Sequence, residues 1–228
     1  MQRPSCRPYL FVLALLVAGC RSAGVHPPLP TNWMDLTRPP APFVALYRLT
    51  CCGQRQLPAV VRSAGERLWV AVSLPPGGVA WEAWFDATGG VAKARGDRCL
   101  SQLSSGRVVL PGGTTLSVEA PLWAALLAGR LPPGMAPVEG SPGWVVGIVE
   151  GGRLAARCGG EPVRCQEVRF RGAEGPELVV RLDRHHGPVP GRLRATAGRQ
   201  RVVLELAEWG PGTELLAPAW LSWPPCPS

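Results

Sequence analysis

Short runs in which apolar and polar residues alternate, separated by glycine- and proline-rich turns, cover most of this chain and constrain its fold more than any other feature. The run at residues 199–209 (RQRVVLELAEW) places Val202, Leu204 and Leu206 on one face of an extended chain, with Glu205 on the other. Further strand-like runs occupy residues 43–49, 67–74, 79–86, 91–95, 107–110, 115–118, 144–150, 153–158, 165–171, 177–183 and 191–197. The pattern predicts a mainly β chain that forms an antiparallel meander with short turns.

One segment departs from this pattern and predicts a helix inserted after the first set of strands. Residues 120–128 (APLWAALLA) have Pro121 in the first turn and Gly129 just past the end, which is the usual placement of these two residues around a helix. Its large apolar side chains form one stripe, so we expect the helix to pack on the sheet. The stripe consists of Leu122, Trp123, Leu126 and Leu127.

The N-terminus has the three parts of a secretory signal peptide. Arg3 and Arg7 make its start positive, residues 10–17 (LFVLALLV) are apolar, and two small residues follow. The apolar stretch is too short to span a bilayer, which needs about 20 apolar residues. Because residues 16–20 (LVAGC) resemble a bacterial lipobox, we expect the mature chain to begin at Cys20 and to carry a lipid on its thiol. The alternative is an ordinary signal peptide followed by a cysteine by chance.

These observations divide the chain into a signal peptide at residues 1–19, a lipidated cysteine and tether at 20–42, and a single β domain at 43–228. Six prolines between residues 27 and 42 disfavour regular structure in the tether. The residue after Cys20 is Arg21 rather than aspartate, which by the sorting rule of diderm bacteria favours the outer membrane. We therefore expect a lipid-anchored protein of the bacterial cell envelope, on the outer membrane and facing the periplasm.

The formal net charge of +8 raises the question of an anionic partner. The arginines are scattered along the strand-like runs rather than clustered, and an exported protein seldom meets nucleic acid, so we expect no nucleic-acid partner. A basic face could instead contact anionic lipid headgroups.

Cysteines are numerous for a chain of this length. Of the eight, Cys6 lies in the signal peptide and Cys20 is the lipidation candidate. The other six form an even set, which in an exported protein predicts disulfides, although sequence alone leaves fifteen pairings open. Our strongest expectation is a bond across a hairpin between Cys158 and Cys165. The adjacent Cys51 and Cys52 point to opposite faces of an extended chain, so we expect them to pair with different partners, drawn from Cys99 and Cys226.

Sequence motifs for catalysis or metal binding are absent. The chain has no GxSxG, HExxH, P-loop or GxGxxG motif and no CxxC pair. Asp183, His185 and His186 could bind a metal, but their position at a strand end before a Gly-Pro pair is more typical of a solvated turn. We expect no enzyme activity, no cofactor and no metal.

Three segments resemble the LolA/LolB family of outer-membrane lipoprotein carriers and receptors. They are the Pro/Gly loop at residues 74–78, the LLAGRLP segment at 126–132 that ends the predicted helix, and the late strand at 199–209. The resemblance spans roughly residues 58–215. It implies an antiparallel open half-barrel, lined by apolar and aromatic side chains and lidded by helices. In this family the loop carries an apolar membrane contact, and here Leu74 at its edge is the candidate.

The leading functional hypothesis is a membrane-anchored lipoprotein that binds lipid or acyl chains in the apolar concave face of the sheet, with a role in delivering lipoproteins or lipids to the outer membrane. The alternative is a structural lipoprotein that docks an envelope protein partner and has no ligand cavity. A hydrolase is the least favoured interpretation, because no nucleophile–base pair is visible. The candidate cavity lining comprises Trp69, Trp81, Phe85, Leu122, Trp123, Leu126 and Trp144.

Overall fold

The computed structural model describes residues 28–38, 40–51, 54–74, 77–87, 89–103, 108–109, 115–116, 120–149, 152–172, 176–187 and 189–226. The predicted signal peptide, Cys20 and the first part of the predicted tether lie outside these residues. Within the described part of the chain, no helix has both the length and the apolar character needed to cross a membrane.

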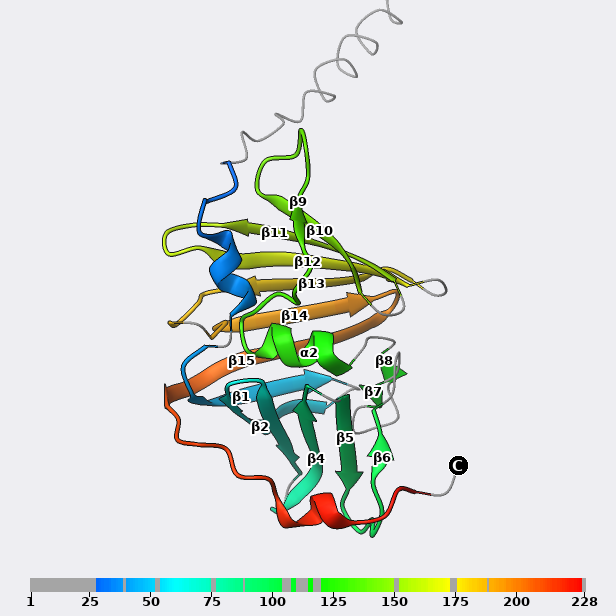
Figure 1. Ribbon diagram of the computed structural model, residues 1–228. Helices are drawn as coiled ribbons and strands as arrows, with labels where there is room; N and C mark the ends of the chain where they lie inside the picture. Colours follow the sequence, from blue (N-terminus) through cyan, green and yellow to red (C-terminus); the bar gives the residue numbers. More distant parts are fainter. Residues whose placement is uncertain are drawn as a thin grey trace, which may run out of the picture.

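Thirteen strands form one antiparallel sheet that does not close on itself, and one short α-helix accompanies it (Figure 1). The prediction of a mainly β chain with an open sheet and one inserted helix is therefore confirmed. The order across the sheet is β6-β5-β4-β3-β2-β1-β15-β14-β13-β12-β11-β10-β9. The strands are β1 (Phe43–Cys51), β2 (Gln54–Ala64), β3 (Arg67–Ser73), β4 (Val79–Asp86), β5 (Gly89–Ala94), β6 (Ser101–Gln102), β9 (Ala136–Pro137), β10 (Trp144–Val149), β11 (Gly152–Gly159), β12 (Arg164–Gly172), β13 (Leu178–Asp183), β14 (Arg192–Ala197) and β15 (Gln200–Pro211).

The first and last long strands of the domain lie side by side in the middle of this sheet. β1 pairs antiparallel with β15, from Phe43 opposite Pro211 to Thr50 opposite Val203. Each half of the sheet is then a simple meander in which neighbours along the chain are also neighbours in space. The two outermost strands, β6 and β9, have two residues each, and the chain between them carries the helix and a separate two-stranded pair, β7 (Val108–Val109) and β8 (Thr115–Leu116).

Helix α2 (Ala120–Leu127) ends where the sequence predicts. Gly129 adopts a left-handed backbone with φ +68°, and the Arg130 N–H donates to the Ala125 carbonyl at 2.7 Å. This closure satisfies carbonyls that the last turn would otherwise leave unpaired. The helix lies across the middle of the sheet in Figure 1 and contacts β4 and β5.

The segment before β1 belongs to the folded domain, although we had assigned it to the tether. Residues Trp33–Thr37 form a 3-10 helix, η1, whose Trp33 and Leu36 side chains are buried in the main core. η1 contacts β12, and its Leu36 carbonyl accepts a hydrogen bond from the Leu131 N–H at 2.8 Å. Trp33 and Leu36 therefore add apolar cover to the sheet, and the packed part of the chain starts before residue 43.

Strand β2 is the long element that the sequence did not predict, because Pro58 interrupts its apolar alternation. Pro58 pairs with Arg48 of β1, whereas the pairing of β2 with β3 begins only at Ala59. The proline thus lies just outside the paired part of β2 and β3, where its missing N–H removes no ladder bond to β3.

Two apolar clusters lie on opposite faces of the sheet. The main cluster fills the face that packs against α2 and η1, which we call the inner face, and it includes Phe85, Leu126 and Leu154. The second cluster lies on the outer face of the first half, where Trp84 packs with Leu215 and Trp220 of the C-terminal segment. A 3-10 helix in that segment, η2 (Ala219–Ser222), passes beneath β4 and β5 in Figure 1.

Candidate functional site

The inner face of the sheet gathers four of the seven side chains that we expected to line a cavity. Phe85, Leu122 and Leu126 are buried in the main cluster, and Trp81 packs against it from a half-buried position. Trp123 lies within α2, but its side chain is outside the described part of the structure. The structure thus brings strand β4 and helix α2 together around one apolar interior.

Two residues of the predicted lining lie on the outer face instead, and the prediction for them is wrong. Strand alternation explains both, because Leu68 and Val70 point inward and therefore turn Trp69 outward, where it joins the second cluster. Trp144 precedes the inward Val145, and its ring faces the outer surface beside Arg169.

Leu74 does not project from its loop as a membrane contact would. It is half-buried and packs against the main cluster. Its carbonyl accepts a hydrogen bond from the Gly77 N–H at 2.9 Å, so the chain turns back directly after it. The neighbouring residues 75–76 lie outside the described residues.

The side chains of helix α2 that the structure describes are apolar and buried. Its sequence, APLWAALL, contains no charged side chain and no polar side-chain group other than the indole N–H of Trp123, and Leu122, Ala124, Ala125 and Leu126 are each exposed by 8% or less. A short helix of this kind is stable only while it is buried. Two surface pockets formed by described residues, of about 920 Å³ and about 580 Å³, are not lined by α2. In the conformation described, helix side chains fill the region where we expected a ligand.

The disulfide between described residues differs from the predicted pairing. Cys99 and Cys226 are bonded to each other, with an S–S distance of 2.00 Å, and not to Cys51 or Cys52. Cys51 ends β1 with its side chain buried on the inner face, and Cys52 lies outside the described residues. The bond joins the start of β6 to the C-terminal segment because that segment folds back across β5 and β6, which no local pattern indicates.

Cys158 and Cys165 lie directly opposite each other across β11 and β12, as the predicted hairpin requires. Both side chains are buried, and in this structure they carry separate thiols. Burial raises the pKa of Cys158 to about 12, and burial together with the neighbouring Cys158 raises that of Cys165 well above its ordinary value. Both groups are therefore protonated and poorly nucleophilic in the folded protein at neutral pH.

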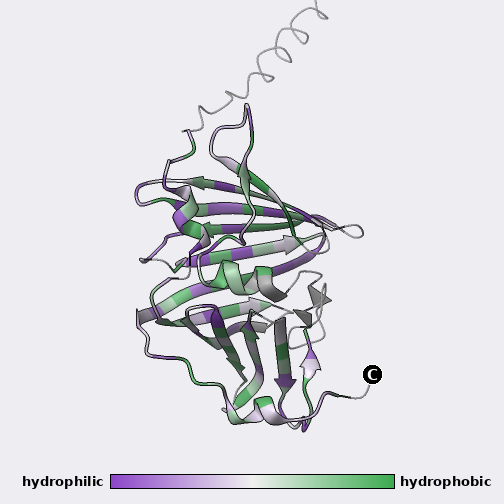
Figure 2. Ribbon diagram, in the orientation of Figure 1, coloured by the Kyte–Doolittle hydropathy of each residue, from purple (hydrophilic) through white to green (hydrophobic). Residues whose placement is uncertain are grey.

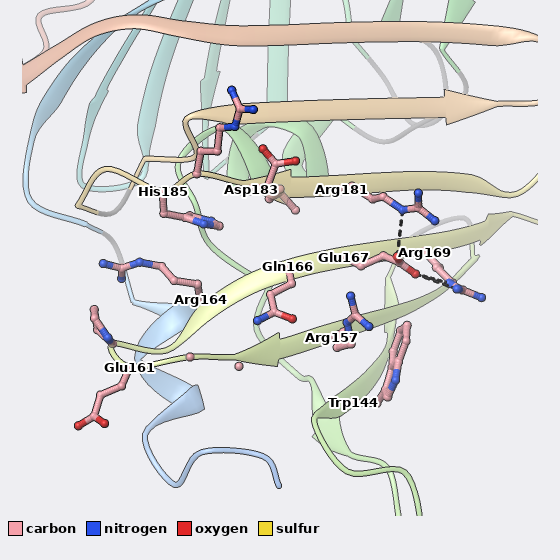
Figure 3. A pocket seen from close by; sticks show the side chains of 15 residues that line it. Trp144, Arg157, Glu161, Arg164, Gln166, Glu167, Arg169, Arg181, Asp183 and His185 are labelled. Atoms are coloured by element: carbon pink, nitrogen blue, oxygen red, sulfur yellow. Dashed lines mark hydrogen bonds and ion pairs between the residues drawn. The ribbon is translucent and has the colours of Figure 1, made fainter. Parts of the chain in front are cut away.

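A polar pocket of about 920 Å³ lies on the outer face of β10–β13, and its residues were not predicted as a site (Figure 3). Cross-strand register sets its residues in a row, in which Trp144 is opposite Arg157, Arg157 opposite Glu167, and Glu167 opposite Arg181. Arginines at the outward positions of consecutive strands were the available signal. It was not recognised because the register that aligns them depends on a bulge beside Cys158.

Glu167 is the buried centre of this row. Its carboxylate accepts hydrogen bonds from Arg169 Nε at 2.8 Å and from Arg181 Nε at 3.2 Å. Burial raises the pKa of Glu167, but the hydrogen bonds and positive charges of the two arginines together outweigh it, so the pKa is lowered. The guanidinium of Arg169 also lies 5.4 Å from the centre of the Trp144 ring, which is a cation–π distance. The ionised Glu167 thereby fixes two arginines at the pocket edge.

Asp183 and His185, which we considered as metal ligands, line the same pocket. Asp183 accepts a hydrogen bond from Arg194 at 3.0 Å. Burial, followed by the charge of Arg164, lowers the pKa of His185, so its imidazole is neutral at pH 7. Within the described residues no group of three His, Cys, Asp or Glu side chains is arranged to hold a metal ion.

No protein-family model matches the chain. No curated protein is significantly similar to it in sequence.

Proposed function

We propose that this protein is a lipid-anchored cell-envelope protein that binds an acyl chain or lipid against the inner face of its open sheet, in the place that α2 occupies in the ligand-free state. The anchor is a lipid on Cys20, and the site faces the periplasm at the outer membrane. Delivery of lipids or lipoproteins, as in the LolA/LolB carriers that the sequence resembles, is the role this arrangement serves.

The observation that carries the proposal is a helix without charged residues, α2, whose described side chains are buried against an open sheet. The side chains of α2 that are described are aliphatic and form no hydrogen bond or ion pair, so apolar packing is what holds them against the sheet. An acyl chain offers the sheet the same kind of contact at about 25 cal/mol per Å². Exchange of helix for ligand therefore changes the energy of the inner face little.

The displaced helix needs an apolar environment of its own. Exposing the side chains of Leu122 and Leu126 to water costs about 2 kcal/mol each. A bilayer surface removes this cost, because an apolar helix can partition into the headgroup–acyl boundary. The anchor at Cys20 keeps such a surface within reach, so ligand uptake is favoured at the membrane rather than in solution.

A titration with a fluorescent acyl probe tests the proposal. The full-length chain in a nonionic detergent below its critical micelle concentration should bind the probe with micromolar or tighter affinity. A substitution that places a charge on the inner face, Val70→Glu, should abolish binding, whereas Val79→Glu at an exposed position of β4 should not. Equal binding by both variants, or no binding by the folded wild type, would refute it.

The alternative, a protein-docking lipoprotein without a ligand cavity, is favoured by one observation. Leu122 and Leu126 are packed to 2% and 0% exposure, while Ile148, at the end of β10, is 89% exposed. A partner protein that covered Ile148 would use an apolar contact that the folded chain leaves open. This function would be favoured over the first if the wild type captured a single envelope protein, the Ile148→Ser variant did not, and the wild type bound no acyl probe.

A further inference from the structure

The pocket on the outer face of β10–β13 contains more positive than negative charge. Five arginines and three carboxylates line it, and the neutral His185 does not change the difference. The lining residues that carry charge are Arg157, Arg164, Arg169, Arg181, Arg184, Glu161, Glu167 and Asp183. The surplus of two positive charges is opposite in sign and similar in magnitude to the charge of a phosphate monoester, which is −1.5 to −2 at about pH 7.

Two of the three carboxylates are already occupied. Glu167 is bound by Arg169 and Arg181, and Asp183 is bound by Arg194, which is not among the lining residues. Among the described residues, Arg157, Arg164 and Arg184 form no ion pair. Their positive charge is therefore available to an anion that enters the pocket.

Arg157 provides an independent indication of a ligand. The residue is half-buried, and its Nε atom is buried without a hydrogen-bond partner among the described residues. Leaving a buried charged donor unpaired is costly, and such groups in folded proteins normally have a partner. In Figure 3 the side chain is drawn beside those of Gln166, Glu167 and Trp144, which also line the pocket.

We propose that this pocket is a binding site for a phosphate monoester group. Arg157 binds the phosphate oxygens, and Arg164, which lies on the other side of Gln166 in Figure 3, turns toward them on binding, because the guanidinium donors of both are uncommitted apart from a 3.4 Å bond from Arg164 to its neighbour's carbonyl. Arg169 and Arg181, 46% and 61% exposed, keep donors free beyond those that Glu167 occupies. The exposed part of Trp144 contacts the group that carries the phosphate, since a volume of about 920 Å³ exceeds what phosphate alone fills.

This site lies on the opposite face of the sheet from α2 and does not depend on the acyl-binding proposal. The phosphate could belong to a lipid headgroup or to a soluble ester, and both present the same dianion to the arginines. The experiment therefore has one arm for each source.

Binding is measured by calorimetry on the full-length chain in a nonionic detergent, at fixed ionic strength. The soluble arm uses inorganic phosphate and glucose 6-phosphate, and the lipid arm uses micelles that contain phosphatidic acid, with phosphatidylcholine as the diester control. The test variant is R157Q/R164Q. The matched control is R153Q, an exposed arginine of the same strand β11 that lies outside the pocket.

We expect binding in at least one arm, and we expect R157Q/R164Q to weaken it at least tenfold, which corresponds to about 1.4 kcal/mol. R153Q should leave it within about twofold, as expected for a surface substitution away from the site. Tighter binding of inorganic phosphate or glucose 6-phosphate would show that the phosphate group belongs to a soluble molecule. Tighter binding of phosphatidic acid would show that it belongs to a lipid headgroup. If the double variant does not fold, R164Q alone replaces it. Absence of binding in both arms, or equal weakening by R153Q, overturns the proposal.

Discussion

Replacing Leu126 with alanine tests whether α2 and a bound acyl chain compete for the inner face. Leu126 is 0% exposed in the main cluster, on the helix that contacts β4 and β5. Truncating a fully buried leucine costs about 3 kcal/mol, the sum of lost transfer energy and of the cavity left behind. Urea unfolding of the ligand-free protein should show this loss.

The competition makes an opposite prediction for affinity. If the ligand displaces α2 into water, in an assay without a membrane, the cost of Leu126→Ala falls on the ligand-free state alone, and the apparent Kd for the acyl probe should decrease. At 1.4 kcal/mol per tenfold, complete transfer of about 3 kcal/mol would tighten binding about 100-fold, and we expect at least about tenfold.

Leu154→Ala is the matched control. Leu154 is also 0% exposed on the inner face, but it lies on β11 in the other half of the sheet. It should lose similar stability without a gain in affinity. Weaker or unchanged probe binding by Leu126→Ala, in a folded protein, would refute the displacement of α2.

Four further predictions concern single groups. Ser63→Ala should stabilise the protein by about 1 kcal/mol in urea unfolding, because the Ser63 hydroxyl is buried without a hydrogen-bond partner; a loss of stability would indicate a missed partner. Glu82→Gln should destabilise it by about 2 kcal/mol, since this carboxylate accepts bonds from Trp69 and Trp220 and pairs with Lys93 at 3.0 Å; a change below about 0.5 kcal/mol would contradict this. Cys158 and Cys165 should react with iodoacetamide at pH 8 only after denaturation, because burial raises the pKa of Cys158 to about 12; lack of reaction after denaturation without reductant would instead reveal the disulfide expected from the sequence. The pKa of Glu167 is lowered on folding, so its contribution to folding stability is present above pH 4.5, its ordinary pKa, and is lost as the pH falls from there through the pKa in the folded protein. The Tm of Glu167→Gln should therefore depend less on pH in this acidic range than the Tm of the wild type. Parallel plots of Tm against pH would exclude the two ion pairs.

Local patterns predicted the individual strands and the helix well, because each depends on residues close in sequence. The alternation around Val202 and Leu204 and the glycine after α2 specify local geometry that the rest of the fold does not override. In Figure 2 the strands β11–β14 alternate between hydrophilic and hydrophobic residues along their length, as that reasoning requires.

The pairing of distant segments was not predictable in the same way. The neighbours β1 and β15, the Cys99–Cys226 bond and the contact between Glu82 and Trp220 each join residues more than 120 positions apart. A tryptophan in a strand can also lie on either face of the sheet, and apolar content alone assigned Trp69 and Trp144 to the wrong face. Counting alternation from the buried neighbours Leu68 and Val145 would have placed both correctly.

The outer-face pocket was missed for a related reason. Four of its arginines come from strands β11, β12 and β13, the fifth, Arg184, directly follows β13, and each is unremarkable in its own segment. They form a site only through register, and a bulge between Arg157 and Cys158 shifts that register by one residue. Sequence reasoning can locate outward positions, but it cannot align them across a bulge that it does not predict.

Hydrogen exchange at the amides of α2, measured with and without a saturating acyl ligand, tests the central claim most directly. Displacement of the helix from the inner face predicts faster exchange for residues 122–127 in the liganded protein, together with slower exchange in β3 and β4, which the ligand then covers. Unchanged or slower exchange in α2 at saturation would show that the helix stays in place and would contradict the account.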